Sequence, residues 1–440
     1  MLLLNCPVQC YSWGKLGDQS EVANLRGASD PEFTIEPNQS YAELWMGTHS
    51  KGPCSIQGQN KQVLLSEWLA EHPEALGSKL QAAICADNQQ PVQLPFLFKV
   101  LSVNKALSIQ SHPTKEQAKK LHAEMPQHYP DDNHKPEMAI ALSPFELLCG
   151  FRPFHEILDH FRSNPEIFEL VDSSAFQALE DAVISKNLPA SSSEAKDALK
   201  TCFQCLMMQP SPLVEKNVNS LAQRLALLLN SKQPSDPEYI MGELVIRLNY
   251  NFPGDVGCFA PFFLNHFLLQ PGEACFLGPN EPHAYLYGDT IECMACSDNT
   301  IRAGLTPKFK DVSTLCNSLT YRMAPPAENK FPATAHPSDP TVTVFNPPVP
   351  EFCVHRIKIS DQRGTKLLSL PTCSILIVIQ GAARVTQDCT HAQPPINELR
   401  RGHVVFIPAN HGASLTVDNA TAAPFEAYRA FTEEETLTEL

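Results

Sequence analysis

Four side chains of the types that bind transition metals occur in three short segments of this chain. Gln110 and His112 are separated by one residue. Because successive strand side chains point to opposite faces, both can lie on one face of a sheet. Glu137 in a His-Lys-Pro-Glu segment adds a carboxylate, and His283 in Pro-Asn-Glu-Pro-His adds a second imidazole. This set suits Zn²⁺, leaves room for a substrate, and keeps a net positive charge that favours Lewis-acid chemistry.

Further segments extend this pattern along the chain. They are 11–14 (Tyr-Ser-Trp-Gly), 41–47 (Tyr-Ala-Glu-Leu-Trp-Met-Gly), 94–100 (Leu-Pro-Phe-Leu-Phe-Lys-Val), 110–153 and 298–308 (Asp-Asn-Thr-Ile-Arg-Ala-Gly-Leu-Thr-Pro-Lys). Their order and content resemble type I phosphomannose isomerases, which are zinc enzymes of the cupin superfamily. The resemblance covers nearly the whole chain and is loosest between about 155 and 250.

The resemblance implies an aldose–ketose isomerase with one Zn²⁺ per chain. Such an enzyme interconverts mannose 6-phosphate and fructose 6-phosphate through a cis-enediol(ate). That reaction supplies mannose 6-phosphate for GDP-mannose synthesis and glycosylation. It requires opening of the sugar ring, a base that moves a proton between C1 and C2, a cation beside the developing oxyanion, and a clamp for the phosphate dianion.

The resemblance also suggests roles for residues near the four ligands. Arg302 matches the active-site arginine of the motif Asp-Asn-x-x-Arg-Ala-Gly and would stabilise the enediolate. Lys135 is a candidate base, His134 a candidate for ring opening, and Asp298 would orient Lys135 or Arg302. The roles of these last three residues are interchangeable at this stage. Candidates for binding the phosphate and hydroxyl groups or lining the sugar pocket are Ser108, Lys99, Lys308, Tyr285 and Glu292.

The composition limits the classes of partner. The chain has 440 residues, of which 43% are hydrophobic and 18% charged, so it is globular and long enough for several cores. The net charge of -15 argues against nucleic acid or an anionic membrane as partner. An anionic metabolite would need a local basic cluster. No stretch is long and apolar enough to span a membrane, and the first residues lack the features of a signal peptide. We expect a cytoplasmic monomer.

The 15 cysteines fit a protein with reduced thiols. Two Cys-x-x-Cys pairs could in principle form a structural zinc site. However, Cys202 and Cys205 lie in a predicted amphipathic helix, and Cys293 and Cys296 in a predicted strand, whose positions three apart point to opposite faces. Neither pair is therefore interpreted as a metal or redox site.

The predicted fold is mainly β with an α-helical insert: two cupin-like jelly-roll barrels plus a helical domain. Residues 1–153 and 251–325 would form the catalytic cupin domain, 154–250 the helical domain, and 326–440 a degenerate C-terminal cupin domain. A helix is predicted over 61–71, and a capping box at Thr114 starts another that continues to Met125. Residues 272–283 read as a hairpin that presents His283. Residues 402–411 repeat this order, but without a Gln-x-His pair, so that barrel would be metal-free and His411 structural. The proline-rich stretch 324–350 reads as a linker.

Two other functions remain open from the residues alone. A cupin oxygenase could hold Fe²⁺ with two histidines and one carboxylate. It would have no need for the basic residues Lys99, Lys135, Arg302 and Lys308, and Gln110 replaces its usual third strong ligand. A non-catalytic sugar-phosphate-binding cupin is the second alternative. It would need neither an intact ligand set nor an arginine beside the metal.

Overall fold

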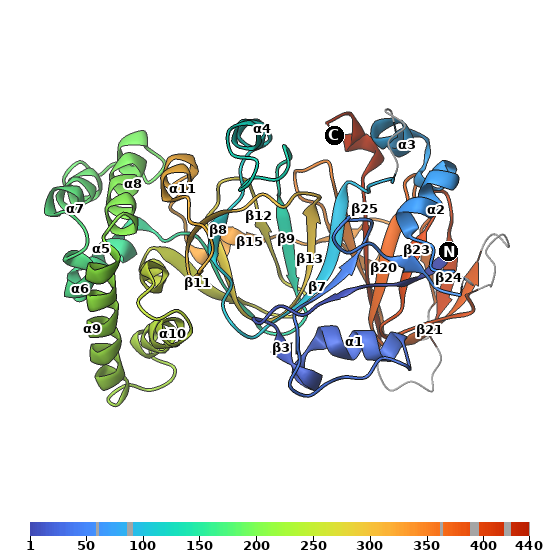
Figure 1. The fold of residues 1–440 in the computed structure, drawn as a ribbon, viewed down its shortest axis with the longest axis horizontal. Coiled ribbons are helices and arrows are strands. Elements are labelled where there is room, and N and C mark those ends of the chain that lie inside the picture. The colour runs from blue at the N-terminus through green and yellow to red at the C-terminus, as the bar shows by residue number, and fades with distance from the viewer. Residues whose placement is uncertain (59–60, 86–90, 361–363, 388–395, 418–423, 440) are drawn as a thin grey trace.

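The computed structural model describes residues 1–58, 61–85, 91–360, 364–387, 396–417 and 424–439. Figure 1 shows a bundle of helices at one end, a sheet in the middle, and the C-terminal strands at the other end. Helix accounts for 33% of the residues and strand for 30%. The prediction of β-sheets with a helical insert is confirmed, although the helices contribute as much of the chain as the strands.

The central sheet contains eleven strands among the described residues. Seven follow the order β15-β12-β9-β13-β7-β5-β2. The other four are β8 and β10, which both pair with β13, and β14 and β11, which pair with β8 and β10 respectively. Their bounds are β2 Val8–Gln9, β5 Glu43–Met46, β7 Phe96–Val103, β8 Ile109–Ser111, β9 Glu137–Ala141, β10 Phe145–Phe151, β11 Leu264–Leu269, β12 Ala274–Leu277, β13 His283–Ala295, β14 Ile301–Gly304 and β15 Lys330–Phe331. Strands from before and after the helical region thus pair in one sheet.

The longest of these strands, β13, joins two groups of neighbours. Its first part pairs with β8 and β10, and its second part pairs with β7 and β9. The change falls at Gly288, whose φ of 116° is unfavourable for other residues. A Cβ there would lie 2.6 Å from the carbonyl oxygen of Pro144. Gly288 therefore lets one strand carry His283 near one end and Glu292 near the other.

The predicted hairpin at 272–283 is wrong in its pairing. The strands β12 and β13 are not neighbours, because β9 lies between them and pairs with both. Local sequence predicts that a turn connects two strands, but not which distant strand will fill the space between them. The ligand His283 still begins its strand as expected.

The C-terminal sheet has eight described strands in the order β16-β17-β18-β25-β20-β23-β1-β6. Their bounds are β1 Leu2–Asn5, β6 Ser55–Ile56, β16 Thr334–His336, β17 Asp339–Phe345, β18 Cys353–Ile359, β20 Ser374–Gln380, β23 Val404–Ile407 and β25 Phe425–Phe431. A four-stranded sheet is built from β19 Thr365–Leu367, β24 Ala413–Thr416, β21 Ala382–Gln387 and β22 Glu398–Arg400, and β3 Lys15–Leu16 pairs with β4 Ser40–Tyr41.

One prediction about this half of the chain needs correction. The stretch 324–350 is more than a linker, because β15, β16 and β17 lie in it and join sheets at both its ends. The N-terminal strand β1, which lies in the segment 1–153 predicted for the catalytic domain, pairs with β23 of the C-terminal sheet. The predicted domain limits stay a proposal.

The helical region packs on the central sheet through a shared hydrophobic core. Phe151 at the end of β10 contacts Phe203 of α8, and Phe203 contacts Phe263, just before β11. The amphipathic spacing at 154–161, 203–208 and 221–229 is confirmed as helical. The helices are α5 Phe154–Ser163, α6 Pro165–Phe168, α7 Ser173–Glu180, α8 Ser193–Met207, α9 Ser211–Leu229 and α10 Pro237–Asn251.

Three described α-helices precede β7, namely α1 Glu21–Ser29, α2 Leu65–Glu71 and α3 Ser78–Ile84. The helix predicted from residue 61 begins only at Leu65, because the Val63 carbonyl accepts a backbone hydrogen bond from Ile56 and Leu64 is extended. The helix α4 Lys115–Glu124 has the predicted capping box, in which Thr114 accepts from the Gln117 N–H and Gln117 accepts in return. One further helix is α11 Val312–Ser318.

Glu146 of β10 ties the central sheet to the helical region. Its carboxylate accepts hydrogen bonds from Arg247 of α10 at 2.6 and 2.8 Å and from His266 of β11 at 2.7 Å. Burial alone would raise the pKa of Glu146, but the bonds from His266 and Arg247 outweigh it and lower the pKa to about 2. The resulting stabilisation is present above the ordinary pKa of 4.5 and is lost as the pH falls toward 2.

We expect Glu146→Gln to lower the thermal unfolding midpoint at pH 7, because Arg247 loses its anionic partner. A pKa lowered from 4.5 to about 2 corresponds to roughly 3 kcal/mol, which bounds the loss. The difference from wild type should shrink between about pH 4.5 and 3, where the unfolded wild-type chain takes up a proton and the folded chain does not. Glu124→Gln is the control, since its pair with Lys120 lies on the exposed surface of α4 and contributes little. Equal effects of the two substitutions would contradict this account.

Candidate active site

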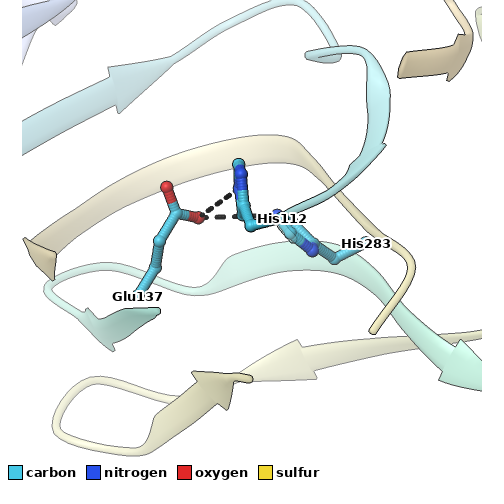
Figure 2. Close-up of side chains that lie close together, drawn as sticks. All are labelled: His112, Glu137 and His283. Carbon is cyan, nitrogen blue, oxygen red and sulfur yellow. Dashed lines mark ion pairs between the residues drawn. The ribbon is translucent and has the colours of Figure 1, made fainter. Parts of the chain in front are cut away.

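Three of the predicted metal ligands converge in the central sheet. His112 follows β8, Glu137 begins β9, and His283 begins β13. The Nε2 atoms of both histidines lie 3.4 Å from Oε2 of Glu137, and Figure 2 shows the three side chains pointing toward one another. Their potential ligand atoms all lie within 4.8 Å of one another, and they form the one such His/Cys/Asp/Glu group found among the described residues. One ion can bridge them.

Backbone carbonyls fix both imidazole rings. The Nδ1 of His112 donates to the carbonyl oxygen of Asn299 at 2.8 Å, and the Nδ1 of His283 donates to that of Glu281 at 2.9 Å. Because carbonyl oxygens only accept, each Nδ1 carries a proton, and in that neutral tautomer Nε2 keeps its lone pair. Both Nε2 atoms are therefore presented as ligands, in the arrangement that metal-binding histidines commonly have.

The charges of this group also fit a cation. Burial lowers the pKa of His112 to about 4, so its ring is neutral at pH 7. Burial would raise the pKa of Glu137, but the Lys135 ammonium and His112 hold it well below its usual range. Nε2 of His112 and Oε2 of Glu137 are buried without a hydrogen-bond partner in the described part of the chain. A metal ion would satisfy both atoms.

Gln110 occupies the fourth predicted position. It lies opposite His283 across β8 and β13, and its Nε2 is 3.5 Å from Nε2 of His283. Its Oε1 faces the hydroxyl of Ser108 at 3.4 Å. Because the two ends of an amide are interchangeable by rotation, half a turn would direct Oε1 to His283. The positions of Gln110 and Ser108 are thus compatible with their predicted roles, which stay predictions.

Lys135 and His134 lie beside the ligands but have different partners. Nζ of Lys135 is 3.1 Å from Oε1 of Glu137, the carboxylate oxygen that faces away from the histidines. Nε2 of His134 contacts Oε1 of Glu351, a buried residue from the segment before β18. The C-terminal part of the chain therefore holds His134, which local sequence could not predict because the two residues are 217 positions apart.

The carboxylate of Asp298 contacts Lys51 rather than Arg302. Its Oδ2 lies 2.6 Å from Nζ of Lys51, and its Oδ1 lies 3.8 Å from Nε2 of His49. Burial would raise the pKa of Asp298, but Lys51, His49 and Lys135 lower it. Among the described residues, no contact between Asp298 and Arg302 is seen that could orient Arg302. Because the charge of Lys135 acts on the pKa of Asp298, the predicted role of Asp298 in orienting Lys135 stays a prediction.

Lys99 is a buried charge rather than an open binding group. Only 6% of Lys99 is exposed, and its Nζ lies 3.0 Å from Glu292 and 3.6 Å from Glu43. Burial would lower the pKa of Lys99, but Glu292 and Glu43 raise it above the ordinary value. Glu43, which also accepts a hydrogen bond from Trp45, was not predicted as a site residue. The sequence signal that could have identified Glu43 is its position as the one charged residue of the otherwise apolar strand β5.

Tyr285 and Glu292 lie in the same interior. The hydroxyl of Tyr285 is buried without a hydrogen-bond partner among the described residues. Burial, followed by the charges of Glu292 and Glu137, raises the pKa of Tyr285 well above its usual value. Burial also raises the pKa of Glu292, against the effect of Lys99. The site therefore contains a carboxyl group that is easier to protonate than usual.

Arg302 flanks the ligands on the strand next to β8. It lies opposite Gln110, whose other neighbour is His283, and directly opposed residues of adjacent strands share one face. Burial lowers the pKa of Arg302, and burial together with Arg302 lowers the pKa of the exposed Lys308. Within the described residues neither cation has a carboxylate partner. Two neighbouring cations without counter-ions favour binding of an anion.

This fold and site define a class of protein, the metal-dependent enzymes. The candidate metal site lies in a β-sheet domain, and the cationic pair of Arg302 and Lys308 beside it suits an anionic substrate. Family models agree with that class. The catalytic domain of type I phosphomannose isomerase matches residues 1–154, and the helical insertion domain of the same enzymes matches residues 170–264. The chain therefore belongs to the type I phosphomannose isomerase family.

Individual relatives span nearly the full chain. Mannose-6-phosphate isomerase of Bos taurus is 46% identical over 414 residues, and that of Homo sapiens is 45% identical over 414 residues; each alignment covers 94% of both chains. Among solved structures, zinc-bound mannose 6-phosphate isomerase is 28% identical with a TM-score of 0.76, covering 98% of this chain and 99% of the other. An arginine-to-alanine variant of phosphomannose isomerase from Salmonella typhimurium is 28% identical with a TM-score of 0.77 and the same coverage.

Proposed function

We propose that this chain is a zinc-dependent mannose-6-phosphate isomerase, which interconverts mannose 6-phosphate and fructose 6-phosphate through a cis-enediol(ate). The observation that carries the proposal is the buried group of His112, Glu137 and His283. Arg302 lies next to this group, opposite Gln110 on the neighbouring strand. Membership of the family supplies the substrate. The ligands of the zinc ion would be these three residues and Gln110.

The chemistry divides between the metal and the charged groups around it. A zinc ion held by these residues would supply a Lewis acid for the carbonyl chemistry of the substrate. In the direction from aldose to ketose, a base removes the proton at C2, the enediolate forms, and a proton is delivered to C1 while a hydroxyl proton moves from O2 to O1. Arg302 would stabilise the enediolate, because a fixed guanidinium needs no reorientation as charge develops.

Lys135 is our first candidate for the proton shuttle between C1 and C2. It is close to the ligand group through its contact with Glu137. Asp298 would act through Lys135, and His134 would assist ring opening while Glu351 holds its ring. Glu292 and Tyr285 would line the sugar pocket, with Ser108 beside Gln110 and with Lys99 compensating the buried carboxylates.

The phosphate group would be bound by Lys308, which lies near Arg302. Lys308 is exposed and has no anionic partner in the described part of the chain, which distinguishes it from most lysines near the site. We expect Lys308→Ala to raise KM by about tenfold while kcat changes less, as loss of uniform binding predicts. Steady-state kinetics with mannose 6-phosphate would measure both constants.

Lys310→Ala is the matched control for this prediction. It removes a lysine two positions away, which lies 3.6 Å from Asp255 and is thus already paired. If Lys310→Ala raised KM as much as Lys308→Ala, general charge attraction rather than a specific phosphate contact would explain the effect.

A coupled assay on mannose 6-phosphate, with and without a chelator, tests the proposed function. Turnover that is lost with chelator and restored by Zn²⁺ is the expected result. Oxygen consumption without isomerisation would instead identify a cupin oxygenase, and tight zinc binding without turnover of any sugar phosphate would identify a binding protein.

Finer features of the proposal concern cellular context. We infer that the enzyme supplies mannose 6-phosphate for GDP-mannose synthesis, acts in the cytoplasm, and works as a monomer built from two cupin-like barrels and a helical insert. No described helix is long and apolar enough to cross a membrane. All cysteines in the described ranges are free thiols, in keeping with a reducing compartment.

A further inference from the structure

Part of the C-terminal sheet repeats the strand arrangement of the central sheet. In the central sheet, β12, β9, β13 and β7 lie side by side and antiparallel, and Glu137 of β9 is opposite Leu277 of β12. In the C-terminal sheet, β23, β20, β25 and β18 lie side by side in the matching order, and Ser374 of β20 is opposite Ile407 of β23. The two sets of four strands can therefore be aligned by register.

The aligned positions in the central sheet carry the buried charges of the active site. Ala139 lies two residues after Glu137 on β9. Across the sheet, Ala139 is opposite Glu292 of β13, and Glu292 is opposite Lys99 of β7. At these aligned positions the carboxylates of Glu137 and Glu292 thus accompany the ammonium group of Lys99. This excess of negative charge suits a site that binds a cation.

The aligned positions in the C-terminal sheet have the opposite charge. Leu376 lies two residues after Ser374 on β20. Across the sheet, Leu376 is opposite Arg429 of β25, and Arg429 is opposite His355 of β18. Nε of Arg429 donates to the hydroxyl of Ser374 at 2.8 Å, and Nη1 donates to the carbonyl oxygen of Leu368 at 2.7 Å. A guanidinium replaces the carboxylate, and no carboxylate accompanies it in the described residues.

The third nitrogen of this guanidinium is left without a partner. Arg429 is only 1% exposed, and its Nη2 is buried with no hydrogen-bond partner among the described residues. The groups around it carry no compensating charge: burial lowers the pKa of His355 to about 3 and raises that of Cys373 to about 12, so both are neutral at pH 7. Burial lowers the pKa of Arg429 to about 9, which still leaves it protonated. An unpaired buried charge of this kind is strongly unfavourable.

We propose that the C-terminal sheet binds one small inorganic anion, such as chloride, at Nη2 of Arg429. The site stands at the register position where the central sheet carries Glu292. An N–H group of Nη2 can donate a hydrogen bond to a monatomic anion. A sugar phosphate is too large for a group so fully enclosed. The C-terminal sheet would thus have exchanged a cation site for an anion site, independently of the isomerase activity.

Thermal unfolding in different salts tests this proposal. The wild-type protein should unfold at a temperature about 2 °C or more higher in chloride or bromide than in isethionate, at equal ionic strength and with the same cation. Arg429→Met, which keeps an unbranched apolar stem and removes the charge, should show no such difference. Arg356→Gln is the control, because Arg356 of the same sheet is already paired with Glu426 at 2.8 Å and its loss should leave the chloride effect intact.

Crystals soaked in bromide give a second test that requires no variant. An anomalous peak beside Nη2 of Arg429 is the expected result, even if Arg429→Met fails to fold. The proposal is overturned if this position shows no bromide peak, if the wild type does not distinguish chloride from isethionate, or if folded Arg429→Met keeps the chloride effect.

Discussion

Replacing His283 with alanine is expected to release the metal ion and to lower kcat/KM by about 10³-fold or more. The substitution removes one of the two imidazoles that face Oε2 of Glu137 at 3.4 Å. A Lewis acid contributes several kcal/mol to stabilising developing charge, and about 1.4 kcal/mol corresponds to a factor of ten in rate. Metal analysis of the purified variant and a coupled isomerase assay would measure the two losses together.

His411→Ala is the matched control for this substitution. The Nδ1 of His411 donates to the carbonyl oxygen of Ala409 at 2.9 Å, the same local contact that His283 makes with Glu281. In the described residues, however, His411 belongs to no group that could hold a metal. Zinc content and activity should therefore survive His411→Ala. Retention of zinc and turnover by a folded His283→Ala protein would disprove the ligand assignment.

Arg302→Ala is expected to lower kcat by about 10² or more, the loss typical of removing one preorganised donor. KM and zinc content should change little, because Arg302 acts on charge that develops only in the transition state. The structure supports this position, since Arg302 is opposite Gln110 and free of carboxylate partners among the described residues. Steady-state kinetics and metal analysis on the same preparation would separate the two effects.

Arg302→Lys should recover only part of this loss, because an ammonium cannot reproduce the planar fork of a guanidinium. Lys308→Ala provides the comparison, since it should alter KM more than kcat. If Arg302→Ala instead kept a near-normal kcat and raised KM strongly, Arg302 would be a phosphate or hydroxyl binder. Lys135, with Asp298, would then carry the chemistry.

Features that depend on short stretches of sequence were predicted well. The capping box at Thr114 formed as expected because both of its hydrogen bonds join residues three apart. The helical spacing between 154 and 229 was confirmed because apolar residues at this spacing form one stripe along a helix. The ligand types were recognisable because few side chains bind zinc, and His112, Glu137 and His283 do come together.

The sequence by itself determined which side chains are available and which local elements present them. Only the tertiary structure decided how those elements pair: β9 separates β12 from β13, and β1 joins the C-terminal sheet. It likewise decided that Lys99 is neutralised by Glu292 and Glu43, that Glu351 holds His134, and that Arg429 has no counter-ion among the described residues. The physical reason is that strand pairing and buried ion pairs join residues far apart in the chain. Their partners are selected by burial and register across the whole fold, which no local pattern encodes.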